Sequence, residues 1–285
     1  LQKLLKVAKD EWCEIAVIET SSHALFFSRV LWIQYDMAVL TNITQDHLDL
    51  HRTMDNYVKT KLKLFKNLIR SQRKPWIKKT AIINLDSDYK ELFLAETYDV
   101  LTTYWFNSDA TLRPLNVKAD INWTSFEVKY PGWNLNIKTL LRWKHNIYNI
   151  MSAIWVFLSL WLKPEDIEKS IWNINWVPGR MEEIQNPEWF KIFIDYAHTP
   201  DAIENVLETI KNIEWINRII TVFWATWDRD KTKRPIMWSI VSAKSDVVIL
   251  TTDDDYSENV HNIVKDILPW IDRVQWQNFW TVLDR

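Results

Sequence analysis

Glycine is nearly absent from this chain, whose 285 residues include 2 Gly and 19 Trp. Average usage would give about 20 glycines at this length, and the Gly and Trp counts together reach that figure. Trp also stands where turns need glycine: Trp224 and Trp227 follow a β-branched run within the segment VFWATWDRD (222–230). Such turns require positive φ or a close backbone approach, which glycine permits and an indole does not. We therefore interpret most of these Trp as glycine codons read with the wrong translation table, most simply UGA.

A genuine Trp-rich surface that stacks on bases or sugars is the alternative. Such a surface would place the indoles on one face. The spacing of the Trp along the chain has no period that would do so. The codons at Trp143, Trp224 and Trp227 decide between the two interpretations, because UGG at all three would exclude the glycine interpretation.

Cysteine is scarce as well. The single Cys13 excludes an internal disulfide and fits a reducing compartment. A net charge of −2 with 25% charged residues is typical of an ordinary soluble globular chain. The uncharged run from Ile150 to Leu162 is shorter than the roughly 20 residues of a membrane span, so we predict a buried helix there. We expect a cytoplasmic protein, and the start at Leu1 instead of Met predicts that the true N-terminus lies upstream.

In the first half of the chain, apolar runs alternate with segments of helical period. We predict buried strands over 14–19, 36–42 and 79–86, and helices over 54–70 and 88–95. This βα alternation indicates a mostly parallel sheet. Residues 112–140 form short alternating segments separated by turn signals, which is typical of an antiparallel patch.

The second half continues the alternation. We predict helices over 146–162, 164–172, 201–211, 234–244 and 259–268, and strands over 190–195, 218–223 and 246–251. Pro178 and Gly179 break structure before the last βα series. The expected fold class is α/β, with a central domain over 1–178 and a second α/β domain over 179–285.

Polar side chains follow two of the predicted strands. Glu19 ends the first strand, and Asp46, His47, Asp49 and His51 follow the second. Ligands gather at the carboxyl ends of parallel strands, and a carboxylate with an imidazole there could hold Mg²⁺ beside a phosphate. The alternative is that these residues are ordinary loop residues and helix caps.

Several sequence motifs of this chain resemble those of the Mur ligases. These are ATP-dependent amide ligases that extend the peptide of the bacterial cell-wall precursor. The resemblance is strongest to the UDP-N-acetylmuramyl-tripeptide synthetase branch, which adds the third amino acid. The matching motifs are IETSSHAL (18–25), TNITQDHLDLHRTMDNYVKTKLKLF (41–65), INLDSD (83–88), WKHNIYNIMSAI (143–154), WVPGRME (176–182), DYAHTPDAIENVL (195–207), VFWATWDRDKTKRP (222–235) and VLDR (282–285). Where the family has glycine, this chain has Trp32, Trp143, Trp176, Trp224, Trp227 and Trp238.

This resemblance spans essentially the whole chain and implies a fold and a metal site. The implied fold is a partial P-loop-type central ATPase domain followed by a Rossmann-like C-terminal domain. Glu19 and His47 match the family's Mg²⁺ ligands, and Lys61 matches a lysine that is carbamylated in the family. A carbamate presents oxygens to Mg²⁺, whereas an ammonium would repel it. Without the resemblance, Lys61 is one of nine basic residues between Lys59 and Lys79, a run typical of a solvated helix face.

Further residues match the family's substrate and nucleotide positions. Ser21 and Arg29 match contacts to the UDP-muramyl-peptide, although Phe27 stands where the family often has Gln. The residues that match ATP-binding positions are His145, Asn146, Asn149, Arg180 and Asp195. From spacing alone, the two Asn could equally cap free N–H groups at a helix start, and His198 and Thr199 fit a helix start as well.

For the incoming amino acid, Arg229 matches the residue that grips its α-carboxylate. Relatives that add meso-diaminopimelate carry an Asp-Asn-Pro-Arg motif where this chain has Asp253, Asp254, Asp255 and Tyr256. Because Arg is absent and carboxylates favour an ammonium, we predict a basic substrate such as L-lysine or ornithine. The alternative is an acidic helix-start turn with no substrate contact.

The resemblance implies ATP and Mg²⁺ as cofactors and an acyl-phosphate route. The implied partners are UDP-MurNAc-dipeptide and a free amino acid, with a monomer that binds neither nucleic acid nor membrane. No GK[ST] phosphate loop occurs, even with every Trp read as Gly. We therefore expect a fragment, truncated at both ends, that does not turn over ATP by itself.

Three other interpretations stay open. The first is another member of the superfamily, a folylpolyglutamate synthase or a Mur-ligase-like amidotransferase subunit. The second is a non-catalytic binding module without a phosphate loop, and the third is a true Trp-rich carbohydrate or nucleic-acid binder. Extending the gene upstream and searching for the phosphate loop separates the second from a ligase.

Overall fold

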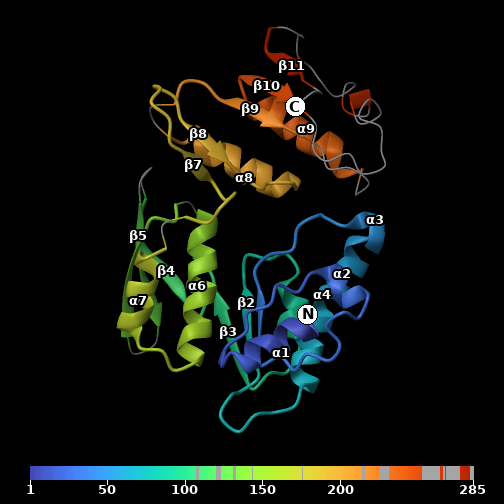
Figure 1. Cartoon of the computed structure of the whole chain (residues 1–285), viewed down its shortest axis with the longest axis vertical. Helices are drawn as coiled ribbons and strands as arrows, with labels where there is room; N and C mark the ends of the chain where they lie inside the picture. Colours follow the sequence, from blue (N-terminus) through green and yellow to red (C-terminus); the bar gives the residue numbers. More distant parts are fainter. Residues whose placement is uncertain are drawn as a thin grey trace.

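A computed structural model gives the fold as two lobes (Figure 1). It describes residues 1–106, 109–119, 123–130, 133–142, 144–174, 176–213, 216–224, 231–251, 264, 265, 267 and 277–282. The lower lobe in Figure 1 holds the elements α1 to α7 and β1 to β6, and the upper lobe holds β7 to β11 with α8 and α9. Mixed parallel and antiparallel sheets place the chain in the α/β class.

The centre of the lower lobe is a parallel sheet of β1 (Met37–Leu40), β2 (Thr80–Asn84) and β3 (Val100–Tyr104), in that order. All of β2 is buried because helices cover both faces of the sheet. Ala81 and Ile83 pack with α4 (Met54–Arg70), while Ile82 points to the other face and packs with α6 (Lys144–Ser159). The predicted strands at 36–42 and 79–86 and the helix at 54–70 are confirmed. The helix predicted at 88–95 is α5 (Lys90–Leu94).

An antiparallel sheet packs on the far side of α6. Its strands are β4 (Arg113–Ala119), β5 (Thr124–Tyr130) and β6 (Trp133–Thr139), and α7 (Pro164–Trp172) covers it. Phe126 and Val128 of β5 share one core with Ile150 and Ile154 of α6. The predicted antiparallel patch over 112–140 is therefore confirmed.

The upper lobe contains a second parallel sheet, of β9 (Ile220–Phe223), β10 (Val247–Leu250) and β11 (Phe279–Thr281). The helices α8 (Pro200–Lys211) and α9 (Lys233–Lys244) pack with it. The predicted strand over 190–195 is β8 (Ile192–Ile194), but it pairs antiparallel with β7 (Glu182–Ile184). Its place in a parallel βαβ series was thus wrong, because the short connection over 185–191 makes a hairpin and a parallel neighbour needs a long crossover. The predicted helix over 259–268 lies mostly outside the described residues.

The predicted strand over 14–19 is wrong. Residues 13–20 form no strand, and Ile15 and Val17 expose their side chains. The segment follows α1 (Gln2–Asp10), which buries none of its own residues. In the described part of the chain β1 pairs with β2 alone, so the segment 13–20 has no strand paired with it. An alternating apolar pattern without a paired strand does not make a strand.

Two tryptophans occupy backbone positions that normally belong to glycine. Trp12 and Trp161 have φ of 60° and 64°, a conformation that is a clear outlier for a bulky residue. Each ends a helix in the two-bond Schellman pattern: Trp12 N donates to Lys9 O and Cys13 N to Ala8 O, and the same pattern recurs at Trp161. Glycine is the usual residue at that position, so the local geometry supports our glycine interpretation.

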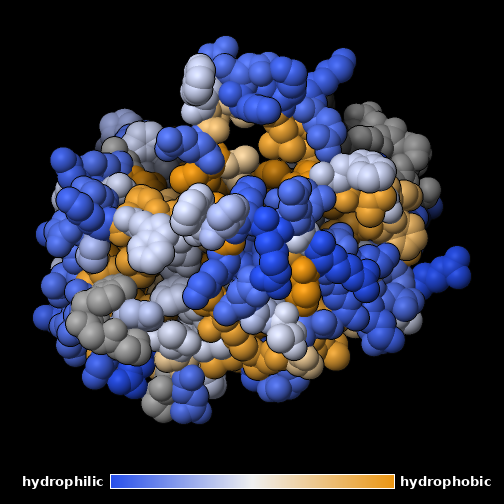
Figure 2. Space-filling model, turned by 90° about the horizontal axis from the view of Figure 1, so that it is seen from below, coloured by the Kyte–Doolittle hydropathy of each residue, from blue (hydrophilic) through white to orange (hydrophobic). Residues whose placement is uncertain are grey.

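The exposed indoles are scattered over the surface. Trp12, Trp32, Trp76, Trp161, Trp176 and Trp189 each expose more than half of their surface, and they belong to different turns of both lobes. Figure 2 views the molecule from the bottom of Figure 1, where hydrophobic side chains reach the surface in separate places among hydrophilic ones. The run 150–162 lies in α6 and the turn after it, and none of the helices in the described ranges has both the length and the hydropathy of a membrane span.

Candidate functional site

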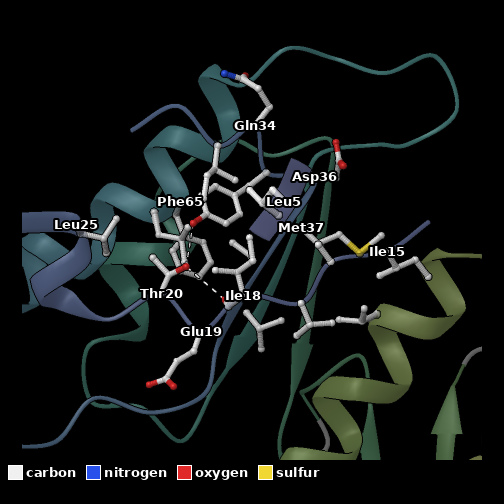
Figure 3. Close-up of a pocket in the computed structure, with 18 of the residues that line it drawn as sticks. Leu5, Ile15, Ile18, Glu19, Thr20, Leu25, Gln34, Asp36, Met37 and Phe65 are labelled. Atoms are coloured by element: carbon white, nitrogen blue, oxygen red, sulfur yellow. Dashed lines mark hydrogen bonds between the residues drawn. The ribbon is translucent and has the colours of Figure 1, made fainter. Parts of the chain in front are cut away.

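One cavity in the lower lobe joins four of the predicted site residues. Glu19, Ser21, His47 and Lys61 all line this cavity, which measures about 780 Å³ and lies between the segment 13–20, β1 and α4. Figure 3 shows the Glu19 carboxylate pointing away from the apolar side chains of Leu5, Met37 and Phe65. Glu19 marks the edge of the cavity where the chain leaves β1, at the opposite end from Gln34 and Asp36.

His47 lies in the turn that follows β1, directly before α3 (Leu48–His51). Its backbone is left-handed, with φ of 57°, and its Nε2 lies 3.4 Å from Asp46 Oδ2. Burial lowers the pKa of His47 to about 4, although the nearby Asp46 carboxylate pulls in the opposite direction. The imidazole is consequently neutral near pH 7, which is the form that ligates a metal.

Lys61 projects from the second turn of α4 towards the same edge. Its Nζ lies 5.2 Å from the centre of the Tyr57 ring. Burial lowers the pKa of Lys61, while the carboxylates of Asp46 and Glu19 act to raise it. A lowered pKa increases the share of neutral amine, and the neutral amine is the species that adds to carbon dioxide to give a carbamate.

The donor set fits Mg²⁺ by its chemistry. A Glu19 carboxylate and a Lys61 carbamate would supply the oxygen ligands that Mg²⁺ prefers, and a neutral His47 would add a nitrogen. Among the described residues, no three His, Cys, Asp or Glu side chains converge closely enough to hold a metal by themselves. The fit therefore depends on modification of Lys61.

Not all the polar residues after β1 join this edge. Asp49 is exposed, and His51 is buried with its Nε2 at 3.0 Å from Ser22 Oγ. Lys79, at the end of the basic run, is buried and donates to Tyr35 O and Asp36. The run is mostly exposed, as expected, and Lys79 is a second exception beside Lys61.

Of the two predicted contacts to the muramyl-peptide, Ser21 lines the cavity and Arg29 does not. Ser21 Oγ accepts the Ala24 amide at 3.2 Å and caps α2 (Ser22–Phe26). Arg29 is exposed and stacks over Phe27, at 5.3 Å from the ring centre, and does not line the cavity.

The residues matched to ATP binding fall into two groups. His145, Asn146 and Asn149 lie in the first turns of α6, as predicted. Asn146 Nδ2 donates to Arg142 O at 2.6 Å, and Asn149 Nδ2 donates to Asn146 Oδ1. These amides donate in the bonds described, so the contacts give no support to an N–H capping role.

The second group belongs to the upper lobe. Both Asp195 oxygens accept backbone amides, from Met181 and Ala197, each at 2.8 Å. Arg180 lies over the Tyr196 ring at 5.1 Å. Burial lowers the pKa of His145, while the charge of Asp195 acts to raise it and that of Arg180 to lower it further.

Sequence reasoning placed Asp46 at this edge but missed its partners in the upper lobe. Asp46 accepts Lys233 Nζ at 2.9 Å and lies 3.6 Å from His198 Nε2, both from the upper lobe. Burial raises the pKa of Asp46, but hydrogen bonds from His198 and Lys233 outweigh it and hold that pKa far below its usual range. Lys233 lies in the motif DRDKTKRP, which gave a sequence signal without indicating a partner. Thr199 caps α8, as predicted.

Arg229, Asp253 and Asp254 lie outside the described residues, as do Trp143 and Trp227. The structure therefore leaves their predicted roles as predictions. The same holds for the division of the chain at Gly179.

Two family models match the chain. The Mur ligase middle domain matches residues 1–157, and the glutamate ligase domain of Mur ligases matches residues 179–282. A UDP-N-acetylmuramoyl-L-alanyl-D-glutamate–2,6-diaminopimelate ligase of Syntrophomonas wolfei is 35% identical over all of this chain, which spans 57% of the relative. A ligase of the same name from Clostridium acetobutylicum is 37% identical over 95% of this chain and 54% of its own length.

Solved structures agree at the level of the fold. A structure of a 2,6-diaminopimelate ligase of the same name superposes with a TM-score of 0.58 at 25% identity, covering 94% of this chain and 54% of that one. Folylpolyglutamate synthase of Mycobacterium tuberculosis with ADP superposes with a TM-score of 0.72 at 17% identity, covering 88% and 54%. The latter identity shows a common fold alone.

These names correct one prediction. The relatives are named for 2,6-diaminopimelate, which is contrary to the predicted preference for lysine or ornithine. The absence of Arg from the TDDDYSE segment was too narrow a basis for that preference, because it rested on one short segment. On the two matches that together cover most of its length, the chain belongs to the Mur ligase family.

Proposed function

We propose that this chain is the catalytic part of an ATP-dependent ligase of peptidoglycan synthesis. In this reaction, the D-glutamate carboxylate of UDP-MurNAc-L-Ala-D-Glu is joined to an amine of 2,6-diaminopimelate. The observation that carries this proposal is that Glu19, His47 and Lys61 line one cavity beside β1. The substrates are taken from the names of the relatives, of which this chain spans little more than half.

The chemistry follows from the groups at the edge. ATP would phosphorylate the glutamate carboxylate, and the amine would then attack the acyl phosphate and release phosphate. Glu19, His47 and carbamylated Lys61 would hold Mg²⁺, which when bound offsets charge on the transferring phosphoryl group. The low pKa of His47 keeps its imidazole neutral, so that one ring nitrogen carries no proton and can bind the metal.

The upper lobe would complete the site. Arg180 would reach the phosphates, Asp195 and the α6 residues His145, Asn146 and Asn149 would contact the nucleotide, and Arg229 would grip the α-carboxylate of the amino acid. Ser21 and Arg29 would contact the muramyl-peptide. Gly179, with a left-handed φ of 66°, is the proposed hinge between a P-loop-type central domain and a Rossmann-like C-terminal domain. Closure about it would exclude water from the acyl phosphate.

An assay of phosphate release tests the function. The full-length gene product, supplied with ATP, Mg²⁺ and UDP-MurNAc-dipeptide, should release phosphate only when an acceptor amino acid is added, and should prefer 2,6-diaminopimelate to lysine. A preference for lysine would overturn the assignment of 2,6-diaminopimelate as the acceptor. Phosphate release with folate and glutamate instead would place the protein with the folylpolyglutamate synthases.

Substitution of Lys61 tests its proposed role as a metal ligand. Lys61→Ala should lower kcat by about 10³-fold or more, because it removes a metal ligand and thereby charge stabilisation of the transferring phosphoryl group. Lys59→Ala is the matched control, since Lys59 is exposed on the same helix in an i,i+4 pair with Asp55. After incubation with ¹³C-bicarbonate, a carbamate carbon signal should appear in the wild type and in the control but not in Lys61→Ala. Equal signals in all three would exclude carbamylation of Lys61.

A further inference from the structure

The two lobes are joined by a buried ion pair. Asp46 follows β1 in the lower lobe, and Lys233 is the first residue of α9 in the upper lobe. Lys233 Nζ donates to Asp46 Oδ1 at 2.9 Å, and the two residues are 1% and 8% exposed. Burying either charge alone would be costly, so each requires the other.

The Asp46 carboxylate has polar neighbours at both oxygens. Besides Lys233, Oδ1 accepts the backbone amide of His47 at 2.9 Å. Oδ2 lies 3.4 Å from His47 Nε2 and 3.6 Å from His198 Nε2. A carboxylate surrounded in this way has little capacity left to bind a metal or to accept a substrate proton.

A second contact lies directly beside the first. Gln45 Nε2 donates to Thr232 Oγ1 at 3.2 Å, so two consecutive residues of the lower lobe meet two consecutive residues of the upper lobe. Gln45 and Thr232 are more exposed, and their contact contributes less. The pairing nevertheless fixes the register between the turn after β1 and the start of α9.

We propose that Asp46 is a positioning residue that pins the upper lobe to the catalytic edge through Lys233 and His198. It holds α9 and the turn before α8 beside the neighbouring His47, while it takes no part in bond making. The kinetic part of this inference rests on the proposed ligase function, whereas the placement of the lobes does not.

A double-mutant cycle tests the pair in the full-length gene product. The variants are Asp46→Asn, Lys233→Gln and the double variant, with KM for the acceptor amino acid, kcat, and the radius of gyration from small-angle X-ray scattering as readouts. Asp46→Asn should lower kcat/KM at least about 30-fold and raise KM, because it leaves Lys233 buried and unpaired. The radius of gyration should increase as the lobes separate.

The fold-loss of kcat/KM in the double variant should be much smaller than the product of the fold-losses in the two single variants, since the double variant leaves no unpaired charge. Lys233→Arg keeps the charge and should recover most of the activity. Asp55→Asn is the matched control: its pair with Lys59 is exposed within α4, and kcat/KM should change by less than about 5-fold.

Two results would overturn the inference. If the losses multiply independently, Asp46 and Lys233 do not act as a pair; if Asp46→Asn lowers kcat with an unchanged radius of gyration and KM, Asp46 acts in the chemistry. Absence of ligase activity in the wild type would refute the proposed function alone, because scattering still reports whether the lobes separate.

Discussion

β1 pairs on one side with β2, residue by residue from Met37 with Thr80 to Leu40 with Ile83. On its other side lies the segment 13–20, across a cavity of about 780 Å³. Both flanking segments, EIAVIE (14–19) and KTAIINLD (79–86), are rich in β-branched apolar residues. The difference is that β2 pairs with a strand on either side and has helices on both faces, whereas 14–19 pairs with no strand among the described residues. Burial thus depends on neighbours as well as on composition.

Hydrogen exchange should show the largest contrast between the two sides. Backbone amides of Ala81, Ile82 and Ile83 should exchange at least about 1000-fold more slowly than those of residues 14–19, because β2 opens only with the whole lobe. Mass spectrometry of overlapping peptides measures both. Similar protection in the two segments would mean that 14–19 pairs as a strand in solution and would remove the contrast.

Side-chain truncation should show the next largest difference. Ile82→Ala should lower the free energy of unfolding by about 2–5 kcal/mol, since Ile82 is fully buried against α6. Val17→Ala should change it by less than about 0.5 kcal/mol, because Val17 is almost wholly exposed. Urea unfolding midpoints with equal slopes provide the measurement, and equal losses would contradict the comparison.

Replacing the tryptophans that have a left-handed backbone should produce the smallest change in the free energy of unfolding, and this change should be an increase. Trp161→Gly should stabilise the protein by about 1 kcal/mol, because it relieves a left-handed backbone at the end of the well-packed α6. Trp12→Gly should change global stability by less than about 0.3 kcal/mol, since α1 buries no residue and opens locally.

Trp189→Gly is the control for this pair, because Trp189 is exposed but has no left-handed φ. It should raise neither the midpoint temperature of thermal unfolding nor the urea midpoint. A loss on Trp161→Gly would show that the indole is accommodated there and would weaken the glycine interpretation.

The sequence predicted the central elements well because their signals are local. The apolar period of α4 and the capping Thr53 at its start are contained in one short segment, as are the turn signals between β4, β5 and β6. The failures concern partners: the segment 14–19 lacks a neighbour, and β8 takes β7 in place of β9.

The candidate site divides in the same way. Glu19, His47 and Lys61 were predicted because a family resemblance marked them, and all three line one cavity. Asp46 and Lys233 were not found as a pair, because nothing in the spacing of two residues 187 positions apart indicates that they meet. That information exists only once both lobes are folded.

The same separation has a consequence for the order of events in folding. Joining residues 187 positions apart closes a very long loop, whose entropic cost is met only after each lobe has formed its own core. Contacts that form late leave the folding rate unchanged and act on the unfolding rate. The Asp46–Lys233 pair should therefore govern how long the two lobes remain together once assembled, and it should have little influence on how fast either lobe folds.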